Sequence, residues 1–133
     1  MRVLIVEDNP TNRQLMLKML SPLGECSEAV DGREAVHAFR QALDDKNPYD
    51  LICLDVMMPQ MDGHEALAHI RQIEREHHIP DERSVKVIMT TAVHSPHSIA
   101  EAQQSGCNGY LVKPIRKVAL YEELERLELI PGA

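Results

Sequence analysis

Polar residues that can ligate a metal or carry charge follow several short apolar runs of this sequence. They are Glu7, Asp8, Asp55, Thr91 and the pair Lys113-Pro114. If the apolar runs are parallel strands, their carboxyl ends meet at one edge of the sheet, where open α/β sheets bind ligands. Three carboxylates, one hydroxyl and one ammonium group would then lie close together.

Carboxylates gathered in this way need a positive partner. Two of them ~4 Å apart repel each other by roughly 4 kcal/mol at an effective dielectric near 20. A divalent cation offsets this repulsion, and Mg²⁺ is typically held by one or two carboxylates together with water and a phosphate. The residues therefore favour phosphoryl chemistry that depends on Mg²⁺, or on Mn²⁺ in its place.

Each of these residues also has a simpler structural explanation when it is considered alone. Asp8 or Asn9 can cap the helix that Pro10 begins, Asp55 can open a turn, Thr91 can end a strand, and Lys113-Pro114 can form a rigid turn. Only the combination of all of them at one sheet edge favours the chemical interpretation.

The elements that must position these residues are visible as periodic patterns. Strands are expected at residues 3–6, 25–30, 51–54, 85–90 and 110–112, each with β-branched or other apolar residues. The first and third runs are almost entirely apolar, which is typical of strands buried on both faces of a sheet. An amphipathic stretch follows each run, so that the chain reads as five strand-helix units.

Helix start and stop signals agree with this pattern. Pro10 suits a first helical position, Asp31 followed by Glu34 resembles a capping box, and Ser95-Pro96 resembles an N-cap with proline behind it. Gly106 is expected to end the fourth helix. Alternating strands and helices predict an α/β fold, with a parallel sheet covered by helices on both faces.

Length and charge limit the class of protein. The 133 residues fit one domain, with 44% hydrophobic and 26% charged residues, and they leave no stretch for an effector domain in this chain. The net charge of −7 argues against direct nucleic-acid binding. The apolar run at residues 3–6 is too short for a signal peptide or for membrane insertion. We therefore expect a cytoplasmic protein.

The cysteines and paired histidines are weak candidates for a metal site. Cys26, Cys53 and Cys107 make an odd number without a CxxC pair, which fits neither a disulfide framework nor zinc. Cys53 lies within an apolar run and is predicted to be a buried, inert thiol. His77-His78 and His94-x-x-His97 lack further ligands and are predicted to be solvated surface.

Four runs of the sequence together resemble the CheY-like receiver domains of two-component signalling. They are VLIVEDNPTNR at 3–13, LDVMMPQMDG at 54–63, MTTA at 89–92 and GYLVKP at 109–114. The runs have the order and spacing of that family and extend over nearly the whole chain. The resemblance implies a flavodoxin-like, doubly wound sheet of five parallel strands in the order 2-1-3-4-5, with five helices.

The resemblance also implies roles for the acidic residues. Asp55 would be the phosphoryl acceptor, and Asp8 would ligate Mg²⁺ together with it. Glu7 would act on the metal through a water molecule, and the backbone carbonyl of Met57 would supply a further ligand. This set of oxygen donors suits the metal that the residues themselves favour.

The remaining site residues follow in the same way from the family. Lys113 would pair with the acceptor carboxylate and later with the phosphoryl oxygens, and the bond before Pro114 would be cis. Thr91 would bond to the phosphoryl group, and Tyr110 would be the switch aromatic. The alternative for Tyr110 is fixed core packing.

The implied function is a signalling module that catalyses its own phosphorylation and dephosphorylation. A sensor histidine kinase or a histidine phosphotransfer protein would donate the phosphoryl group, in a phosphorelay or a simpler pathway. The response would be a switch on the face made by the fourth helix, fifth strand and fifth helix, near residues 94–117, which an unknown protein target would read. Met57 and Val93 are apolar where a polar residue could orient water, so loss of the phosphoryl group is expected to be slow.

Three alternatives remain open at this stage. The chain can be a stand-alone receiver, or a receiver module cut from a hybrid kinase or a larger regulator. A Mg²⁺-dependent aspartyl-phosphate phosphatase is disfavoured, because Met57 stands where such enzymes generally place a second aspartate. A flavodoxin-like cofactor binder is disfavoured by an aromatic content of 3%, with no Trp and no phosphate-binding glycine loop.

Overall fold

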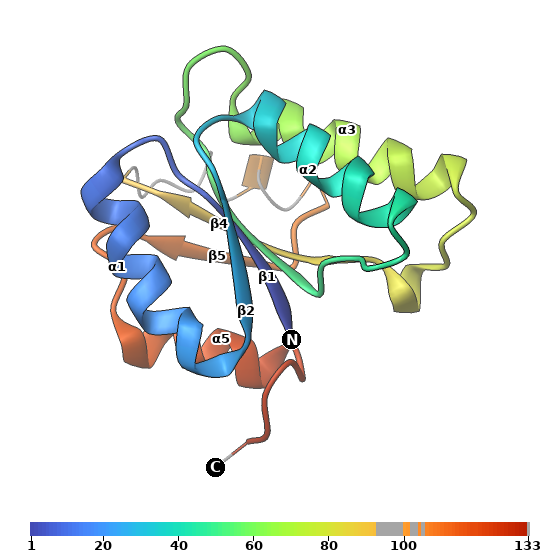
Figure 1. Ribbon diagram of the computed structural model, residues 1–133. Coiled ribbons are helices and arrows are strands. Elements are labelled where there is room, and N and C mark those ends of the chain that lie inside the picture. The colour runs from blue at the N-terminus through green and yellow to red at the C-terminus, as the bar shows by residue number, and fades with distance from the viewer. Residues whose placement is uncertain (93–99, 102–103, 105, 133) are drawn as a thin grey trace.

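The computed structural model describes residues 1–92, 100–101, 104 and 106–132, which form one sheet between two layers of helices (Figure 1). The strands are β1 (Arg2–Val6), β2 (Glu25–Ala29), β3 (Leu51–Asp55), β4 (Lys86–Thr91) and β5 (Gly109–Val112). The α-helices are α1 (Pro10–Leu20), α2 (Gly32–Asp44), α3 (Gly63–Glu76) and α5 (Lys117–Arg126). Two short 3-10 turns, η1 (Ser21–Leu23) and η2 (Asp81–Arg83), lie between them.

All strand pairs are parallel, and the strand order is β2-β1-β3-β4-β5. This confirms the α/β fold class and the order implied by the family resemblance. Every predicted strand is present, and each observed boundary lies within one residue of the predicted one. The first and third strands are internal to the sheet, as their apolar sequences indicate.

The helix count differs from the prediction of five. Four α-helices occur in the part of the chain that the structure describes. The predicted helix that starts at Ser95-Pro96 falls largely on positions outside the described residues. Gly106, its expected end, is described and has a φ of 90°, the left-handed conformation common just past a helix.

Local capping explains where the first helices begin. Asn9 caps α1 by accepting a hydrogen bond from the Asn12 N–H at 3.0 Å, and Pro10 occupies the first turn. Asp31 caps α2 through the Glu34 N–H at 2.9 Å, which confirms the predicted cap. The Glu34 carboxylate accepts in return from the N–H of Val30, one residue before the cap.

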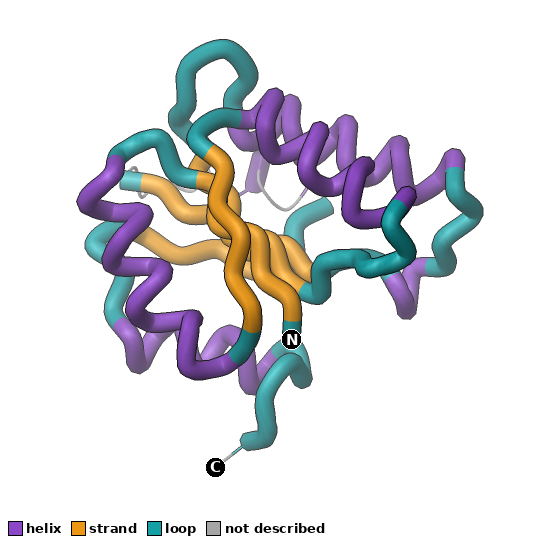
Figure 2. Tube along the Cα trace, in the orientation of Figure 1, coloured by secondary structure: helices purple, strands orange, loops and turns teal. Residues whose placement is uncertain are grey.

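Helices lie on both faces of the sheet (Figure 2). The core consists of two apolar layers, one on each face. Helices α2 and α3 cover one face, where Phe39, Leu67 and Ile70 belong to the same buried cluster as Leu54. Helices α1 and α5 cover the other face, where Leu20 and Leu124 are fully buried. Both layers leave the carboxyl ends of the strands free to present polar side chains at one edge.

Helix α3 begins in direct contact with the end of β3. A Cβ atom placed on Gly63 would lie 2.5 Å from the Asp55 carbonyl oxygen, closer than real Cβ atoms come. The Gly63 N–H also donates to the Val56 carbonyl at 2.9 Å. The absence of a side chain at Gly63 therefore lets α3 pack against the backbone that carries Asp55.

A further prediction concerns the burial of Cys53. Cys53 is 2% exposed, and burial raises its pKa to about 12, which confirms a buried thiol that stays protonated. Among the helices of the described residues, none has the length and apolar character needed to cross a membrane.

Candidate functional site

Three carboxylates converge at the carboxyl edge of the sheet. Glu7 and Asp8 follow β1, Asp55 ends the neighbouring β3, and one oxygen from each lies within 4.8 Å of the others. Glu7 is 3% and Asp55 is 2% exposed, whereas Asp8 is open to solvent. The sequence placed these three residues at one edge, and the structure brings them together.

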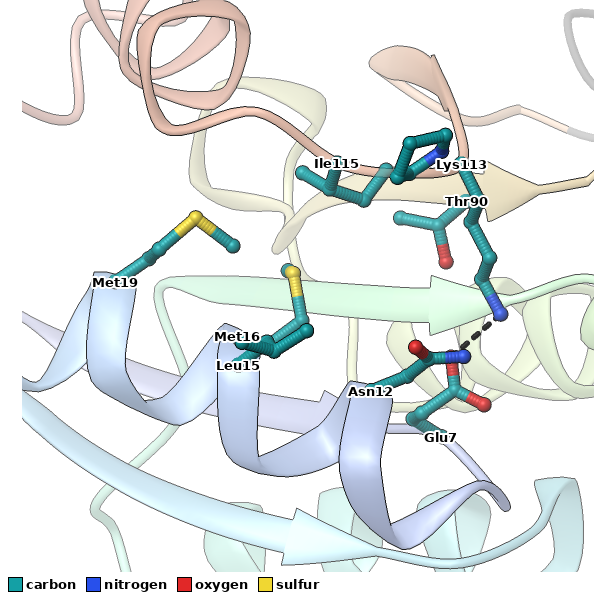
Figure 3. Close-up of a pocket in the computed structure, with 9 residues that line it drawn as sticks. Glu7, Asn12, Leu15, Met16, Met19, Thr90, Lys113 and Ile115 are labelled. Atoms are coloured by element: carbon teal, nitrogen blue, oxygen red, sulfur yellow. Dashed lines mark hydrogen bonds and ion pairs between the residues drawn. The ribbon is translucent and has the colours of Figure 1, made fainter.

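Lys113 connects the carboxylates from the end of β5. Its Nζ lies 2.5 Å from Glu7 Oε1 and 3.2 Å from Asp55 Oδ1. Figure 3 shows the lysine side chain extending from the strand end toward Glu7. The family resemblance implied the pair with Asp55, but the shorter bond to Glu7 was not anticipated. The following Lys113-Pro114 peptide bond is cis, as the resemblance implied.

The proton balance of the cluster favours Asp55 as the protonated member. Burial, and next the charge of Glu7, raise the pKa of Asp55 to about 7 against the opposing effect of Lys113. Burial also acts to raise the pKa of Glu7, but hydrogen bonds from Lys113 and from the Asn9 N–H outweigh it, so the pKa lies below its ordinary value. Burial alone would lower the pKa of Lys113, but Glu7 and Asp55 raise it, which keeps the ammonium charged.

Backbone contacts hold the acidic residues in place. The Asn9 N–H donates to Glu7 Oε2 at 3.1 Å, and the Met57 N–H donates to Asp55 Oδ1 at 3.3 Å. Arg13 donates to the Glu7 carbonyl at 2.9 Å while its Nε lies 3.2 Å from Glu28. Arg13 belongs to the sequence run at 3–13, but nothing in the sequence indicated that it anchors the backbone of Glu7.

Thr91 and Tyr110 line a cavity next to Asp55. Thr91 is 2% exposed at the end of β4, and Tyr110 lies on the adjacent β5. Met57 lines the same cavity with its side chain 66% exposed. His64 on α3 contributes from the other side, with Nε2 3.8 Å from Glu101. The predicted switch residues therefore face one space beside the acceptor candidate.

A shallow, mainly apolar pocket adjoins the site on the α1 side (Figure 3). Lys113 and Glu7 form its polar end. The rest of the lining comes from α1, β4 and the start of the β5-α5 connection: Asn12, Leu15, Met16, Met19, Thr90, Pro114 and Ile115. Leu15 is 52% exposed, so the site is bordered by accessible apolar surface.

Comparison with known families identifies the class of protein. The family described as the response regulator receiver domain matches residues 3–125. The chain therefore belongs to the response regulator receiver domains. These are signalling modules of two-component systems, as the sequence runs indicated.

Similar proteins include both single-domain and multidomain members. Chemotaxis protein CheY-3 of Vibrio cholerae is 36% identical over 129 residues, which are 96% of this chain and 91% of that protein. The histidine-protein kinase BarA of Shigella flexneri is 35% identical over an alignment of 138 positions, which covers all of this chain but 13% of that protein.

Solved structures agree with the fold. The receiver domain of Ssk1, co-crystallised with the histidine phosphotransfer protein Ypd1 of Saccharomyces cerevisiae, superposes with a TM-score of 0.82 at 29% identity, covering 99% of this chain and 93% of that one. The receiver domain of the kinase PA1611 of Pseudomonas aeruginosa gives 0.75 at 32% identity and covers 94% of each chain. That structure has a magnesium ion in its active-site cleft.

The donor set of this chain fits a hard divalent cation. Glu7, Asp8 and Asp55 offer carboxylate oxygens only, and no nitrogen or sulfur ligand joins the group among the described residues. Oxygen donors with one exposed side suit Mg²⁺, which retains several of its waters. The cluster can therefore hold the metal that the sequence predicted.

Proposed function

We propose that this receiver domain accepts a phosphoryl group on Asp55 in a reaction that requires Mg²⁺. The observation that carries the proposal is the convergence of Glu7, Asp8 and Asp55 with Lys113 placed 3.2 Å from the Asp55 carboxylate. No other carboxylate cluster of this kind occurs in the described part of the chain. A buried carboxylate with a positive partner and a metal-ligating neighbour is equipped to act as a nucleophile toward phosphorus.

The donor is a phosphohistidine of a sensor histidine kinase or a histidine phosphotransfer protein. An Asp55 oxygen forms the new bond to phosphorus while the bond from phosphorus to the histidine nitrogen breaks, and that nitrogen keeps the electron pair and takes up a proton. Asp55 must be ionised to attack. The metal, once bound, neutralises charge on the transferring oxygens.

The side chains around Asp55 have separate tasks in this proposal. Asp8 and Asp55 would hold the metal together with the Met57 carbonyl, and Glu7, from the same cluster, would act on it through water. Lys113 leaves its place between the carboxylates to pair with a phosphoryl oxygen, as a compact point charge can. The Thr91 hydroxyl donates to another phosphoryl oxygen.

The similar proteins support the proposed phosphoryl donor and protein partners. A yeast receiver domain co-crystallises with a phosphotransfer protein, and this supports a histidine-containing donor for the present chain. Relatives include a single-domain chemotaxis protein and a much longer kinase, so that a stand-alone regulator and a receiver module of a hybrid kinase both fit. The downstream partner in the proposal is a protein that reads the switched face.

Phosphorylation with a small-molecule donor tests the proposal directly. Incubation with acetyl phosphate or phosphoramidate and Mg²⁺ is expected to raise the intact mass by one phosphoryl group. Asp55→Asn and excess EDTA are expected to abolish the increase. Asp44→Asn, which changes an exposed aspartate at the end of α2, is the matched control and is expected to label normally.

Two results would overturn the assignment. Equal labelling of Asp55→Asn would place the phosphoryl group elsewhere. Steady turnover of phosphate esters by the wild-type chain would favour a phosphatase over a signalling module.

A further inference from the structure

Arg71 lies at the centre of a cluster of polar groups at the opposite end of the sheet from Asp55. Its guanidinium donates to the Gly106 carbonyl from Nε at 3.2 Å and from Nη2 at 2.9 Å. Nη2 also donates to Asn108 Oδ1 at 3.0 Å, and Nη1 donates to Glu74 Oε1 at 2.7 Å and to the Val85 carbonyl at 2.9 Å. We call this group of five residues the Arg71 clamp.

The clamp uses the full donor capacity of an arginine. The guanidinium has five N–H donors in a fixed fork, and five hydrogen bonds are present. The side chains of Arg71 and Glu74 are only 15% and 6% exposed, and the bonds to Glu74, Val85 and Asn108 are partly shielded from water, whereas those to Gly106 lie at the surface. A lysine has three donors on one atom and cannot reach all four acceptors.

The clamp joins the amino-terminal starts of β4 and β5. The second Glu74 oxygen accepts from the Val85 N–H at 2.7 Å, directly before β4. Asn108, directly before β5, bonds to both polar backbone groups of Val87: its side chain accepts from the N–H at 2.8 Å and its N–H donates to the carbonyl at 2.8 Å. These bonds set the register between the two strands before the regular pairing begins at Ile88 and Gly109.

The residues that lead into β5 are also held from the other face of the sheet. Arg126 on α5 donates to the Asn108 carbonyl at 2.6 Å. Gly106 adopts a φ of 90°, which other residues rarely adopt, and so turns its carbonyl oxygen to Arg71 at little conformational cost. Residues 106–108 are therefore a fixed point between α3 and α5.

The two strands that the clamp joins carry one half of the candidate site. Strand β4 ends in Thr91, and Lys113 directly follows β5. Both strands run in parallel from the clamp to the site. The acidic cluster comes from β1 and β3, to which the clamp makes none of its hydrogen bonds. Metal ligands and phosphoryl-binding groups thus have separate structural supports.

We propose that Arg71 is a positioning residue for phosphoryl binding: by fixing the starts of β4 and β5, it sets where Thr91 and Lys113 lie relative to Asp55. This inference rests on the proposed function, because it assigns Thr91 and Lys113 to the phosphoryl oxygens. A shift of either strand along the sheet would move those groups while leaving the metal ligands in place. Binding of the phosphoryl group should therefore depend on Arg71, and binding of the metal alone should not.

The test compares two affinities in the variant Arg71→Lys. Mg²⁺ affinity is measured by calorimetric titration, and the affinity for beryllofluoride, a phosphoryl mimic, is measured by ¹⁹F NMR in saturating Mg²⁺. We expect Mg²⁺ affinity to stay within about twofold of wild type and beryllofluoride affinity to fall by about fivefold or more, the scale of typical coupling between sites. The matched control is Arg75→Lys, an exposed arginine one turn further along α3, which is expected to change neither affinity.

A second variant keeps the proposal testable if Arg71→Lys fails to fold. Asn108→Ala retains the pair between Arg71 and Glu74 and removes only the side chain that joins β4 to β5. It is expected to show the same selective loss, and in the double variant the two losses should not add, because they break one network.

The possible results separate the two proposals. Failure of the wild-type chain to bind beryllofluoride would contradict the proposed function itself. If the wild type binds it, unchanged beryllofluoride affinity in Arg71→Lys or Asn108→Ala would overturn the role of the clamp. A parallel loss of Mg²⁺ and beryllofluoride affinity would also overturn it, because that result indicates a purely structural contribution.

Discussion

Lys113 shares its charge between two buried carboxylates, and this arrangement determines the resting state of the site. The lysine lies closer to Glu7 than to Asp55, at 2.5 Å against 3.2 Å. Glu7 is thereby held in its ionised form, whereas Asp55 is the carboxylate that takes a proton. Metal binding must displace that proton, because a carboxylate ligates in its ionised form.

The affinity for Mg²⁺ is expected to increase with pH. Burial and the charge of Glu7 raise the pKa of Asp55 to about 7, so its ionised fraction changes steeply around neutrality. We expect binding to be about tenfold weaker at pH 6 than at pH 8, the ratio of ionised fractions for a group with that pKa. Calorimetric titration with Mg²⁺ at both pH values measures this difference. Equal affinities would contradict the assignment of a proton to Asp55.

The same pKa shift has an opposite effect on the stability of the metal-free protein. A raised folded-state pKa stabilises the fold below the ordinary pKa of an aspartate, and this contribution is lost as pH rises through about 7. The lowered pKa of Glu7 acts in the other direction, since its contribution is lost as pH falls. Saturating Mg²⁺ should abolish the decrease in stability that Asp55 causes as pH rises.

Removal of Asp8 is expected to relieve repulsion within the cluster. Without metal, Asp8→Ala should melt slightly higher than wild type, on the order of 2 °C, because the exposed position of Asp8 lets water screen most of the repulsion. Its Mg²⁺ affinity should fall. Asp81→Ala, at an exposed site in η2 before the start of β4, should give no rise. A clearly lower melting temperature for Asp8→Ala would show that the carboxylates do not repel.

At the scale of elements, the start of α3 determines where Asp55 lies. Gly63→Ala would bring a methyl group 2.5 Å from the Asp55 carbonyl oxygen, a backbone atom that cannot rotate away. The better helix propensity of alanine does not offset this contact, so a net loss of about 1–3 kcal/mol in unfolding free energy is expected. Mg²⁺ affinity should fall with it, because the backbone of Asp55 must shift.

A control glycine shows whether the contact or the substitution itself matters. A Cβ on Gly132 meets nothing within 4 Å, so Gly132→Ala should remain within about 0.5 kcal/mol of wild type. Denaturant unfolding of both variants measures the difference. Equal stabilities for Gly63→Ala and Gly132→Ala would indicate that α3 moves away from β3 without cost.

Local sequence patterns were sufficient to predict the strands, the helix caps and the position of the acidic cluster. Every strand was predicted within one residue. The cap at Asp31 was predicted, and that of α1 was limited to Asp8 or Asn9, because capping depends on neighbouring residues. The edge that gathers Glu7, Asp8 and Asp55 follows from strand ends alone. The strand order itself came from the family resemblance, since periodicity does not specify which strands are neighbours.

Contacts between distant positions could not be predicted in this way. The preference of Lys113 for Glu7 joins residues 106 positions apart, and the bond between Arg71 and Asn108 joins residues 37 apart. Neither pair has a local sequence signal, because side-chain partners across a fold depend on how the helices pack on the sheet. Arg71 therefore resembles any other polar residue of an amphipathic helix until the fold is known.

For the whole molecule, the sheet has two ends with different properties. One end holds the acidic cluster and the cavity lined by Thr91 and Tyr110. The other end is fixed by the Arg71 clamp, with Arg126 on the opposite face. Under the proposed function, a rearrangement that starts at Asp55 is therefore expected at the site end of β5 and not at the clamp.

Binding of a phosphoryl mimic should produce a switch on the face made by β5, α5 and the helix predicted from the sequence between Ser95 and Gly106. A Thr91 hydroxyl drawn toward a phosphoryl oxygen frees space into which the Tyr110 ring can turn, since both line one cavity. Packed cores favour two discrete arrangements over gradual deformation. The phosphoryl group can shift the balance between them only by the difference in its contacts with the two, about a few kcal/mol. Much of the predicted face, including residues 94–99, lies outside the described residues.

NMR of the backbone amides with and without beryllofluoride, in Mg²⁺, measures this switch. Shift changes are expected near Asp8, Asp55 and Thr91, and also across residues 99–110, as a switch at Tyr110 requires. Helix α2 contacts α3 but contributes no residue to the lining of this cavity. It therefore serves as the internal control, and only small shift changes are expected there. Changes confined to the loops around Asp8, Asp55 and Thr91 would show that Tyr110 is fixed core packing and that the phosphoryl group does not drive this switch.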